Sequence, residues 1–305
     1  MKPIIQVLGP TGVGKSRIAI RLARAFGGEI ISADSMQVYR HFDIGTDKIQ
    51  PPDMQGIPHY LIDTLSDCSQ FNASMFLEQS FAIAEAIVQR GKIPIVCGGT
   101  ALYLRVMIRG IFPESSEKRV TRDTLNRIVE RRGLECLWKK LNAIDPEYGR
   151  KIGKNDRVRI VRAMEIFYNN NRVPPSEAFR GTCSPFHDYN FIRLGLTMDR
   201  ENLYRRIETR VDQMIARGLA EEVKGLRERY PDTCPPFKSL GYKEMLMHLN
   251  GEITDLDETV RLIKQHSRNF AKRQLSWFRQ ENDIHWFDPE KYDEIEQFMN
   301  RSLHA

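Results

Sequence analysis

The stretch GPTGVGKS (residues 9–16) follows a short apolar run, IIQVL (4–8), and leads into SRIAIRLARAF (16–26), where apolar residues recur at helical spacing. It matches the pattern G-x-x-x-x-G-K-[ST], whose glycines let backbone N–H groups approach phosphate oxygens at the start of a helix. A strand before the loop and a helix after it are the context that confirms such a loop. The sequence therefore predicts a site for a phosphate or diphosphate group, without indicating which molecule carries it.

Further strand candidates alternate with helical stretches along the chain, which is typical of a doubly wound parallel sheet. The candidates are EIIS (29–32), HYLID (59–63), IPIVC (93–97) and FIRLGL (191–196). The predicted fold class is α/β, with a P-loop NTPase-like parallel sheet flanked by helices.

A basic, wholly helical segment interrupts this alternation between IFPESSEK (111–118) and VPPSEAFRGTCSPFH (173–187). We interpret it as an inserted all-helical domain. The predicted division is 1–113 for the first part of the P-loop core, 114–188 for the inserted helical domain, and 189–305 for the second part of the core with basic C-terminal helices.

Composition indicates an ordinary globular protein with a basic balance. The 305 residues include 46 Lys+Arg against 40 Asp+Glu, and the predicted pI of 9.0 suits a polyanionic partner. No apolar run approaches the roughly 18 residues that span a bilayer, so we expect neither a secreted nor a membrane-bound protein. The five cysteines are far apart and odd in number, which does not suit a disulfide framework and favours the reduced cytoplasm. They are Cys68, Cys97, Cys136, Cys183 and Cys234.

Basic residues concentrate in two segments. Residues 117–162 hold fourteen Lys/Arg against seven Asp/Glu, and 261–279 hold six Lys/Arg and no acid. Arg261, Lys264, Arg268 and Lys272 fall three or four apart along one helix face. Each stripe alone is compatible with a solvated helix surface, but two of them together favour a nucleic-acid partner, since Lys and Arg neutralise phosphates.

Two polar residues follow strand candidates, where ligands of open α/β sheets bind. Asp34 follows EIIS and could accept a proton from a nucleophile, although an Asx turn or a helix N-cap is an equal alternative. Thr100 follows IPIVC and two glycines, and a helix N-cap is its simplest interpretation. A kinase or nucleotide hydrolase often has an acidic residue at such a strand end, so Gly98-Gly99-Thr100 argues against ATP chemistry.

Five stretches together resemble one family over nearly the whole chain. In order they are GPTGVGKS (9–16), DSMQVYRHFDIGTDK (34–48), GGTALYLR (98–105), ENLYRRIETRVDQMIARGLAEEV (201–223) and KSLGYKEM (238–245). The resemblance is to the tRNA dimethylallyltransferases, the bacterial isopentenyl-tRNA transferases. It implies that the loop binds dimethylallyl diphosphate and that the dimethylallyl group is transferred to N6 of the adenine at position 37, beside the anticodon of tRNA, with release of diphosphate.

The resemblance also implies roles for individual residues. Asp34 would be the general base for the N6 proton, Thr100 would lie near diphosphate and base, and Arg210 would neutralise the departing diphosphate. The loop residues that would bind diphosphate are Gly9, Pro10, Thr11, Gly12, Val13, Gly14, Lys15 and Ser16, and Ser16 can also ligate Mg²⁺, the expected cofactor. The residues that would contact tRNA are Asp34, Ser35, Met36, Gln37, Thr100, Arg122, Val158, Arg159, Ile160, Val161, Arg162, Lys238, Ser239, Leu240, Gly241, Tyr242 and Lys243.

Some of these positions keep other interpretations. The family often has glutamine where Val158 stands and arginine where Lys238 and Lys243 stand, so the sequence does not predict a specific base contact at Val158 or a planar guanidinium contact at the two lysines. From the sequence alone Arg210 suits a solvated helix position, and Gly241-Tyr242 suits a turn beside a helix.

Two rival functions fit the phosphate loop. A P-loop kinase of a nucleoside or another small metabolite would consume ATP without RNA. A nucleic-acid-binding P-loop module that uses nucleotide as a switch would form no covalent product. The expected partners are otherwise tRNA and dimethylallyl diphosphate, with no membrane, for a protein expected to be a monomer.

Overall fold

The computed structural model describes residues 1–112 and 120–304 and divides into two compact units. The core unit comprises Met1–Ile108 and Pro185–Ala305, and the helical unit comprises Arg109–Ser184. The expected boundary between residues 113 and 114 lies outside the described residues. The one expected after residue 188 instead falls after Ser184, because the Phe186 ring packs against Phe81 and Tyr189 of the core unit, with centroids 5.2 Å apart in both pairs.

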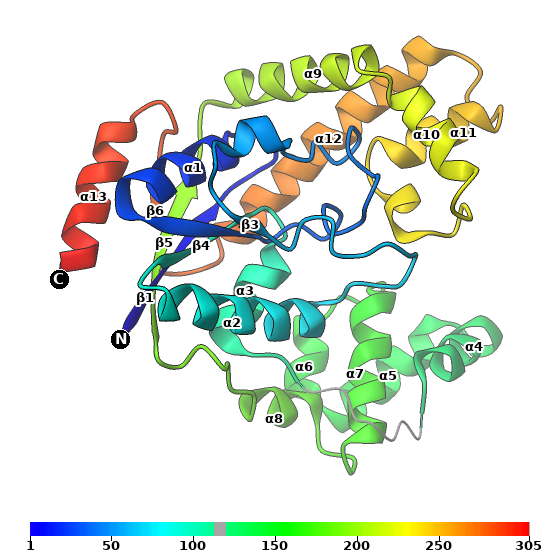
Figure 1. The fold of residues 1–305 in the computed structure, drawn as a ribbon. Helices are drawn as coiled ribbons and strands as arrows, with labels where there is room; N and C mark the ends of the chain where they lie inside the picture. Colours follow the sequence, from blue (N-terminus) through cyan, green and yellow to red (C-terminus); the bar gives the residue numbers. More distant parts are fainter. Residues whose placement is uncertain (113–119, 305) are drawn as a thin grey trace. The chain divides into compact units, whose positions relative to one another are not determined.

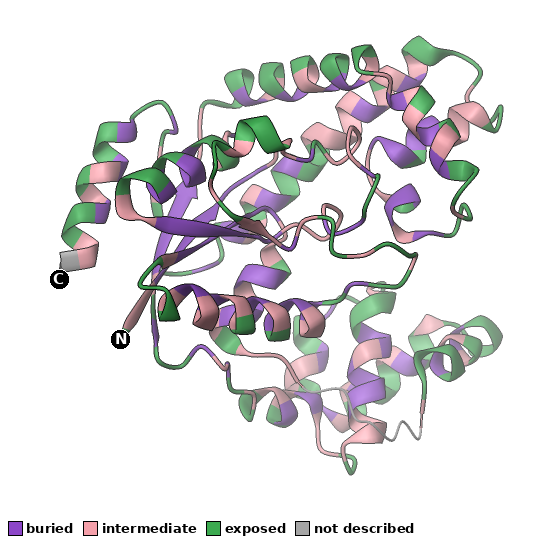
Figure 2. Ribbon diagram, in the orientation of Figure 1, coloured by how far each residue is buried: buried purple, intermediate pink, exposed green. Residues whose placement is uncertain are grey.

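Six parallel strands of the described chain form one sheet in the core unit, in the order β3-β2-β4-β1-β5-β6 (Figure 1). The strands are β1 (Lys2–Leu8), β2 (Gly28–Ser32), β3 (His59–Tyr60), β4 (Ile93–Gly98), β5 (Tyr189–Leu196) and β6 (His285–Phe287). The apolar run 4–8 is fully buried, as expected for a central strand of a parallel sheet covered on both faces (Figure 2). The predicted parallel α/β sheet is confirmed.

Helices α1 (Lys15–Phe26) and α2 (Ala73–Gln89) cover opposite faces of this sheet (Figure 1). In α1, Ile18 and Leu22 recur at helical spacing and are fully buried against the strands. The helix ends at Gly27, whose left-handed φ of 65° lets its N–H donate to the Ala23 carbonyl. The predicted sequence of strand, loop and helix is therefore present.

The remaining elements of the core unit complete its two faces and its C-terminal part. They are α3 (Ala101–Arg109), α9 (Arg200–Ala216), α10 (Leu219–Arg227), α11 (Tyr242–Leu249), α12 (Leu256–Phe278), α13 (Tyr292–His304) and the 3₁₀ turns η1 (Pro51–Met54) and η2 (Pro235–Lys238). None of the helices in the described chain combines the length and apolar character that crossing a membrane requires.

The helical unit contains α4 (Arg122–Arg132), α5 (Leu134–Ile144), α6 (Pro146–Lys151), α7 (Arg157–Asn169) and α8 (Pro175–Arg180). Leu125, Leu141 and Ile160 are fully buried in its own apolar cluster. The unit therefore has a core independent of the sheet, as a separate domain requires.

Two local expectations about strands differ from the structure. The predicted strand HYLID ends at Tyr60, because Leu61 and Asp63 have left-handed φ values of 60° and 54° that break an extended chain. Strand β6 was not predicted, since three residues carry no alternation that a sequence pattern can detect.

The expectation that the cysteines form no disulfide is wrong for one pair. Cys68 and Cys234 are bonded, with Cα atoms 4.9 Å apart although 166 positions separate them in the sequence. Pairing depends on which segments the fold brings together, so spacing could not reveal it. Cys97, Cys136 and Cys183 are free thiols.

The end of β4 provides a test of how closely the site loops are packed. A Cβ on Gly98 would lie 2.2 Å from the Ala33 carbonyl oxygen, directly before Asp34. We expect Gly98→Ala to lower the free energy of unfolding by about 1–3 kcal/mol, as overpacked core positions do. Urea unfolding measures it.

Gly225→Ala is the matched control, because Gly225 lies in α10 and a Cβ there meets no atom of the described chain within 4 Å. Helix propensity should raise its stability by up to about 1 kcal/mol. Equal stability of Gly98→Ala and the parent would contradict the close packing.

Candidate active site

Three loops at one edge of the sheet carry the predicted site residues. The phosphate loop follows β1, Asp34 lies two residues beyond β2, and Thr100 lies two residues beyond β4. Because β4 lies between β2 and β1, and all three strands are parallel, the loop with Thr100 lies between the other two. Ligands of open α/β sheets bind outside these strand ends. The topology therefore gathers residues that are far apart in the sequence.

The phosphate loop has the backbone geometry of an anion site. Gly12 and Gly14 have left-handed φ values of 80° and 97°, and α1 begins immediately afterwards at Lys15. The N–H groups of a first helical turn have no intrahelical acceptor, and together with the turned loop they form a nest for an anion. Lys15 Nζ donates to the Pro10 carbonyl at 2.8 Å, which holds the ammonium over the loop.

Lys15 is electrostatically sensitive. The pKa of Lys15 is lowered to about 8, mainly because burial penalises its ammonium; Cys97 and Asp34 oppose this lowering and Arg210 contributes to it. A bound anion favours the charged form, so binding of a phosphate group and protonation of Lys15 are coupled.

Helix α9 lies against the phosphate loop. A Cβ on Gly12 would lie 2.9 Å from Ile207 Cγ1, so the loop and the helix are in close contact. Three residues further along α9, Arg210 Nη1 donates to Thr11 Oγ1, and Arg210 Nε lies 2.9 Å from Asp47 Oδ2. The interpretation of Arg210 as a solvated helix residue is therefore wrong.

Asp34 is turned by its own local hydrogen bonds. Its Oδ1 accepts from the N–H groups of Met36 at 2.8 Å and Gln37 at 3.3 Å, which is the Asx turn considered as an alternative. Its Oδ2 accepts no hydrogen bond from any described residue, so one carboxylate oxygen orients the side chain and the other is free to accept a proton. The turn and the role of base are compatible.

Thr100 occupies the N-cap position of α3, where its carbonyl accepts from the N–H groups of Tyr103 and Leu104, and its side chain contacts another loop. Its Oγ1 accepts from the Ser35 N–H at 3.2 Å, and its own N–H donates to the Ala33 carbonyl at 3.2 Å. Both contacts are to the loop that carries Asp34. A hydrogen bond accepted by the Thr100 side chain from an N–H group of α3 is not among the contacts of the described residues.

Two residues that the sequence did not single out connect these loops. Gln274 of α12 accepts from the Thr11 N–H at 2.8 Å and donates to the Gly99 carbonyl at 2.9 Å. Asp47 pairs with Arg210, and its carbonyl accepts from Gln37 Nε2 at 3.4 Å. Gln274 lies in the basic segment 261–279, and Asp47 lies in the stretch 34–48. No sequence spacing indicates that a glutamine or an aspartate connects two loops.

These contacts close a circuit around the strand ends. It runs through Asp34, Gln37, Asp47, Arg210, Thr11, Gln274, Gly99, Thr100 and Ser35. The phosphate loop and the loop with the candidate base are therefore joined on two sides.

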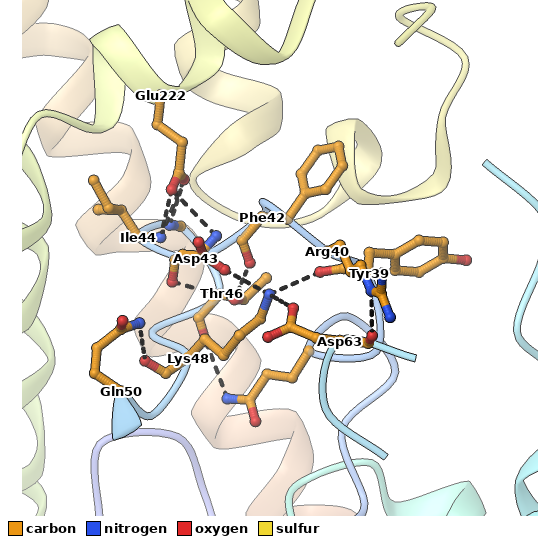
Figure 3. A network of polar contacts seen from close by, with 12 residues as sticks. Tyr39, Arg40, Phe42, Asp43, Ile44, Thr46, Lys48, Gln50, Asp63 and Glu222 are labelled. Atoms are coloured by element: carbon orange, nitrogen blue, oxygen red, sulfur yellow. Dashed lines mark hydrogen bonds and ion pairs between the residues drawn. The ribbon is translucent and has the colours of Figure 1, made fainter. Parts of the chain in front are cut away.

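The loop that follows Gln37 is braced by two charged side chains (Figure 3). The buried Lys48 donates to the Tyr39 carbonyl at 2.7 Å and to the carboxylates of Asp43 and Asp63 at 2.6 Å. Glu222 of α10 accepts from three successive backbone N–H groups, those of Asp43, Ile44 and Gly45. A buried ammonium with three acceptors is fully satisfied, so this loop is held firmly.

The stretch from Lys238 to Lys243 is divided by burial. Lys238 and Lys243 are exposed and Ser239 and Leu240 are half-buried, whereas Tyr242 is fully buried. The Tyr242 hydroxyl donates to Glu222 at 2.5 Å, and Gly241 is the N-cap of α11 with a φ of 87°. The turn interpretation of Gly241 agrees with this geometry, and the Tyr242 side chain holds Glu222 rather than facing solvent.

The residues of the helical unit that are predicted to contact tRNA also differ in burial. Ile160 and Val161 lie inside its apolar cluster, so their side chains cannot reach RNA, whereas Val158 is 79% exposed. Arg159 is exposed beside Asp156. Arg122 and Arg162 both pair with the buried Glu165, at 2.8 and 2.6 Å.

The basic face of α12 is partly neutralised. Arg261 pairs with Glu258, Lys264 with Asp212 and Arg268 with Glu208. Its excess charge is therefore smaller than the sequence count indicates, and Lys272 is the member of the stripe for which no ion pair is found with a described residue.

The Ser16 hydroxyl suits a hard cation that takes most of its ligands from a bound phosphate group and water. Ser16 is exposed at the start of α1, and its hydroxyl makes no hydrogen bond with a described residue. No group of three or more His, Cys, Asp or Glu side chains in the described chain is arranged to hold a metal ion. Mg²⁺ commonly takes few protein ligands together with substrate phosphates and water, so these residues fit it.

Comparison with known proteins agrees with this arrangement. Residues 37–281 match the model of the family described as IPP transferase. The tRNA dimethylallyltransferase of Geobacillus thermodenitrificans is 41% identical over 293 residues, covering 95% of this chain and 92% of that protein. That of Geobacter metallireducens is 44% identical over 296 residues, covering 96% and 94%.

Solved structures are similar over nearly the whole chain as well. The full-length tRNA isopentenylpyrophosphate transferase of Bacillus halodurans superposes with a TM-score of 0.74 at 37% identity, covering 100% of this chain and 97% of that one. A eukaryotic dimethylallyltransferase, crystallised while acting on tRNA, gives a TM-score of 0.83 at 32% identity, covering 96% and 76%. With the phosphate loop, the strand-end residues and these matches in agreement, the chain belongs to the IPP transferase family.

Proposed function

We propose that this protein transfers a dimethylallyl group from dimethylallyl diphosphate to N6 of the adenine at position 37 of tRNA, releasing diphosphate. The observation that carries the proposal is the circuit at the strand ends, which joins an anion nest with Lys15 and Arg210 to a carboxylate with one free oxygen, that of Asp34. The chain belongs to the IPP transferase family, and the relatives that it resembles are tRNA dimethylallyltransferases, which supports the same reaction.

The chemistry divides between the two sides of the circuit. On the donor side the C1–O bond breaks and its electron pair moves to the diphosphate, where the loop amides, Lys15 and Arg210 stabilise the growing charge. On the acceptor side the N6 lone pair forms the bond to C1, and the N6 proton passes to Asp34 Oδ2. An adenine amine is a weak nucleophile, so removal of this proton and positioning of the two substrates are the main contributions of the protein.

Mg²⁺ is the proposed cofactor, and the Ser16 hydroxyl would help to hold it. When bound, it neutralises charge on the leaving group.

The proposed tRNA contacts are the exposed members of the predicted set. In the core unit these are Lys238 and Lys243, and in the helical unit Val158, Arg159 and the partly exposed Arg122 and Arg162. The long basic side chains in this set, which are all of its members except Val158, can neutralise backbone phosphates without reading sequence. Extruding the target base from its stack costs a few kcal/mol and is easiest in a loop, which favours the anticodon loop. We further propose that the protein acts as a monomer in the cytoplasm, where tRNA is available.

The direct test is incubation of the protein with unmodified tRNA, dimethylallyl diphosphate and Mg²⁺ in the absence of ATP. Mass spectrometry of the digested tRNA should show one adenosine heavier by one dimethylallyl group. Phosphorylation of a nucleoside with ATP, and no change in tRNA, would instead identify the kinase.

Asp34→Asn tests the base while preserving the turn, because the amide oxygen of Asn can accept the same two backbone hydrogen bonds. We expect turnover to fall about 10²- to 10⁴-fold, the usual contribution of general base catalysis, with unchanged tRNA affinity. Single-turnover kinetics and a filter-binding assay measure the two quantities.

Asp67→Asn is the control, since Asp67 also accepts a backbone N–H two residues ahead, that of Ser69, in an exposed loop. It should retain full turnover. Full turnover by Asp34→Asn would remove Asp34 from the role of base.

The lowered pKa of Lys15 predicts how diphosphate binding depends on pH. Below pH 8 the ammonium is charged, and above it the unliganded protein must take up a proton to bind the anion. The dissociation constant for inorganic pyrophosphate should therefore rise about tenfold between about pH 7 and 9. Isothermal titration calorimetry measures it.

Lys15→Arg is the reference, because a guanidinium stays charged throughout this range. In Lys15→Arg, the change of the pyrophosphate dissociation constant with pH reports only the titration of pyrophosphate itself. Equal slopes in the two proteins would show that Lys15 does not titrate in this range.

A further inference from the structure

Arg210 is restrained by two loops at once. Its Nη1 donates to Thr11 of the phosphate loop, and its Nε lies 2.9 Å from Asp47 Oδ2. The contact with Asp47 is an ion pair and not an aligned hydrogen bond, since this buried Nε has no hydrogen-bond partner among the described residues. A long side chain on a helix is thereby fixed at its end, with one donor still unsatisfied.

Asp47 is presented by a rigid turn. Its left-handed φ of 50° is one that Asp and Asn tolerate better than most residues. Its N–H donates to the Ile44 carbonyl at 3.0 Å, and the N–H of Lys48 donates to the Asp43 carbonyl at 3.0 Å. Lys48 and Glu222 brace the same turn from either side (Figure 3). The backbone that carries the Asp47 carboxylate is thus held in place, with the carboxylate beside the Arg210 guanidinium.

The backbone of the same turn contacts the acceptor side. Gln37 Nε2 lies 3.4 Å from the carbonyls of both Thr46 and Asp47. The Gln37 N–H in turn donates to Asp34 Oδ1 at 3.3 Å. One short turn therefore connects the residue that faces the leaving group with the residue that takes the proton.

Charge balance also requires Asp47. Lys15 and Arg210 are both cations and repel each other, and the charge of Arg210 lowers the pKa of Lys15. Without a nearby anion, Arg210 would gain by turning away from the loop toward water, because its side chain is long and partly exposed. Arg217 approaches Asp47 Oδ1 only to 3.7 Å, so Arg210 is the principal partner of Asp47.

We propose that Asp47 is a positioning residue, which holds Arg210 over the phosphate loop so that the guanidinium meets the departing diphosphate. This rests on the proposed function insofar as the anion is the diphosphate of a prenyl donor. Asp47 touches neither substrate in this account and acts through Arg210.

The first measurement is a double-mutant cycle on pyrophosphate affinity, made with the full chain. Asp47→Asn keeps the left-handed turn and removes the charge. With Arg210 present we expect about three- to tenfold weaker binding, the range that corresponds to immobilising one long side chain on binding. In the Arg210→Ala background the same substitution should not weaken binding.

Two results would overturn the proposal. Tighter pyrophosphate binding by Asp47→Asn in both backgrounds would show that Asp47 only repels the anion. Equal weakening in both backgrounds would show a general structural effect. This measurement needs no tRNA, so it decides the role of Asp47 even if the transferase assay fails and the proposed function with it.

The second measurement is turnover with tRNA and dimethylallyl diphosphate. Asp47→Asn should lower kcat about 10- to 10²-fold, as displacement of a catalytic group by about 1 Å does, and change the KM for tRNA less than about threefold. Unchanged kcat would overturn the proposal.

Asp212→Asn is the matched control, because Asp212 lies on α9 and pairs with a cation, Lys264, at 2.7 Å without touching the phosphate loop. It should bind pyrophosphate and turn over like the parent. Thermal unfolding of all variants confirms that each is folded.

Discussion

The position of β4 between β2 and β1 is the constraint on which the site depends. In a parallel sheet all strands end at the same edge, so this order places the loop with Thr100 between the phosphate loop and the loop with Asp34. Gly98 is needed for the close approach of β4 to the Ala33 carbonyl. The strands therefore set the separation of the phosphate loop from the loop with Asp34, and the hydrogen bonds of Thr100 and Gln274 connect these loops.

Charge at this edge is arranged in alternation. Lys15 and Arg210 supply positive charge over the phosphate loop, while Asp34 and Asp47 supply negative charge beside them. The two cations can neutralise a bound diphosphate. When no anion is bound, the two carboxylates offset their charge. The buried ammonium of Lys48 holds the loop around Asp47 through its ion pairs with Asp43 and Asp63. Loss of these carboxylates would be destabilising, because an unpaired buried charge is costly.

Resemblance to a family identifies functional segments, and burial distinguishes the residues in them that can contact a substrate from those that support the fold. In the stretch from Lys238 to Lys243 the lysines are exposed and Tyr242 is inside, holding Glu222. In α7 the side chain of Val158 is exposed and that of Ile160 is core. A stretch that resembles a family motif can hold both residues that contact a substrate and residues that support them, and only the packing distinguishes the two.

The sequence by itself determined the parallel α/β sheet, the phosphate loop and the helical insertion, because strand, loop and helix are encoded by local periodicity and glycine placement. It also indicated Asp34, from its place after a strand, and Arg210, although the latter only through resemblance. The bridge from Gln274 to Thr11, the pairing of Asp47 with Arg210 and the bond between Cys68 and Cys234 were decided by the tertiary structure. Each joins residues distant in sequence, and no local pattern records which loops the sheet brings together.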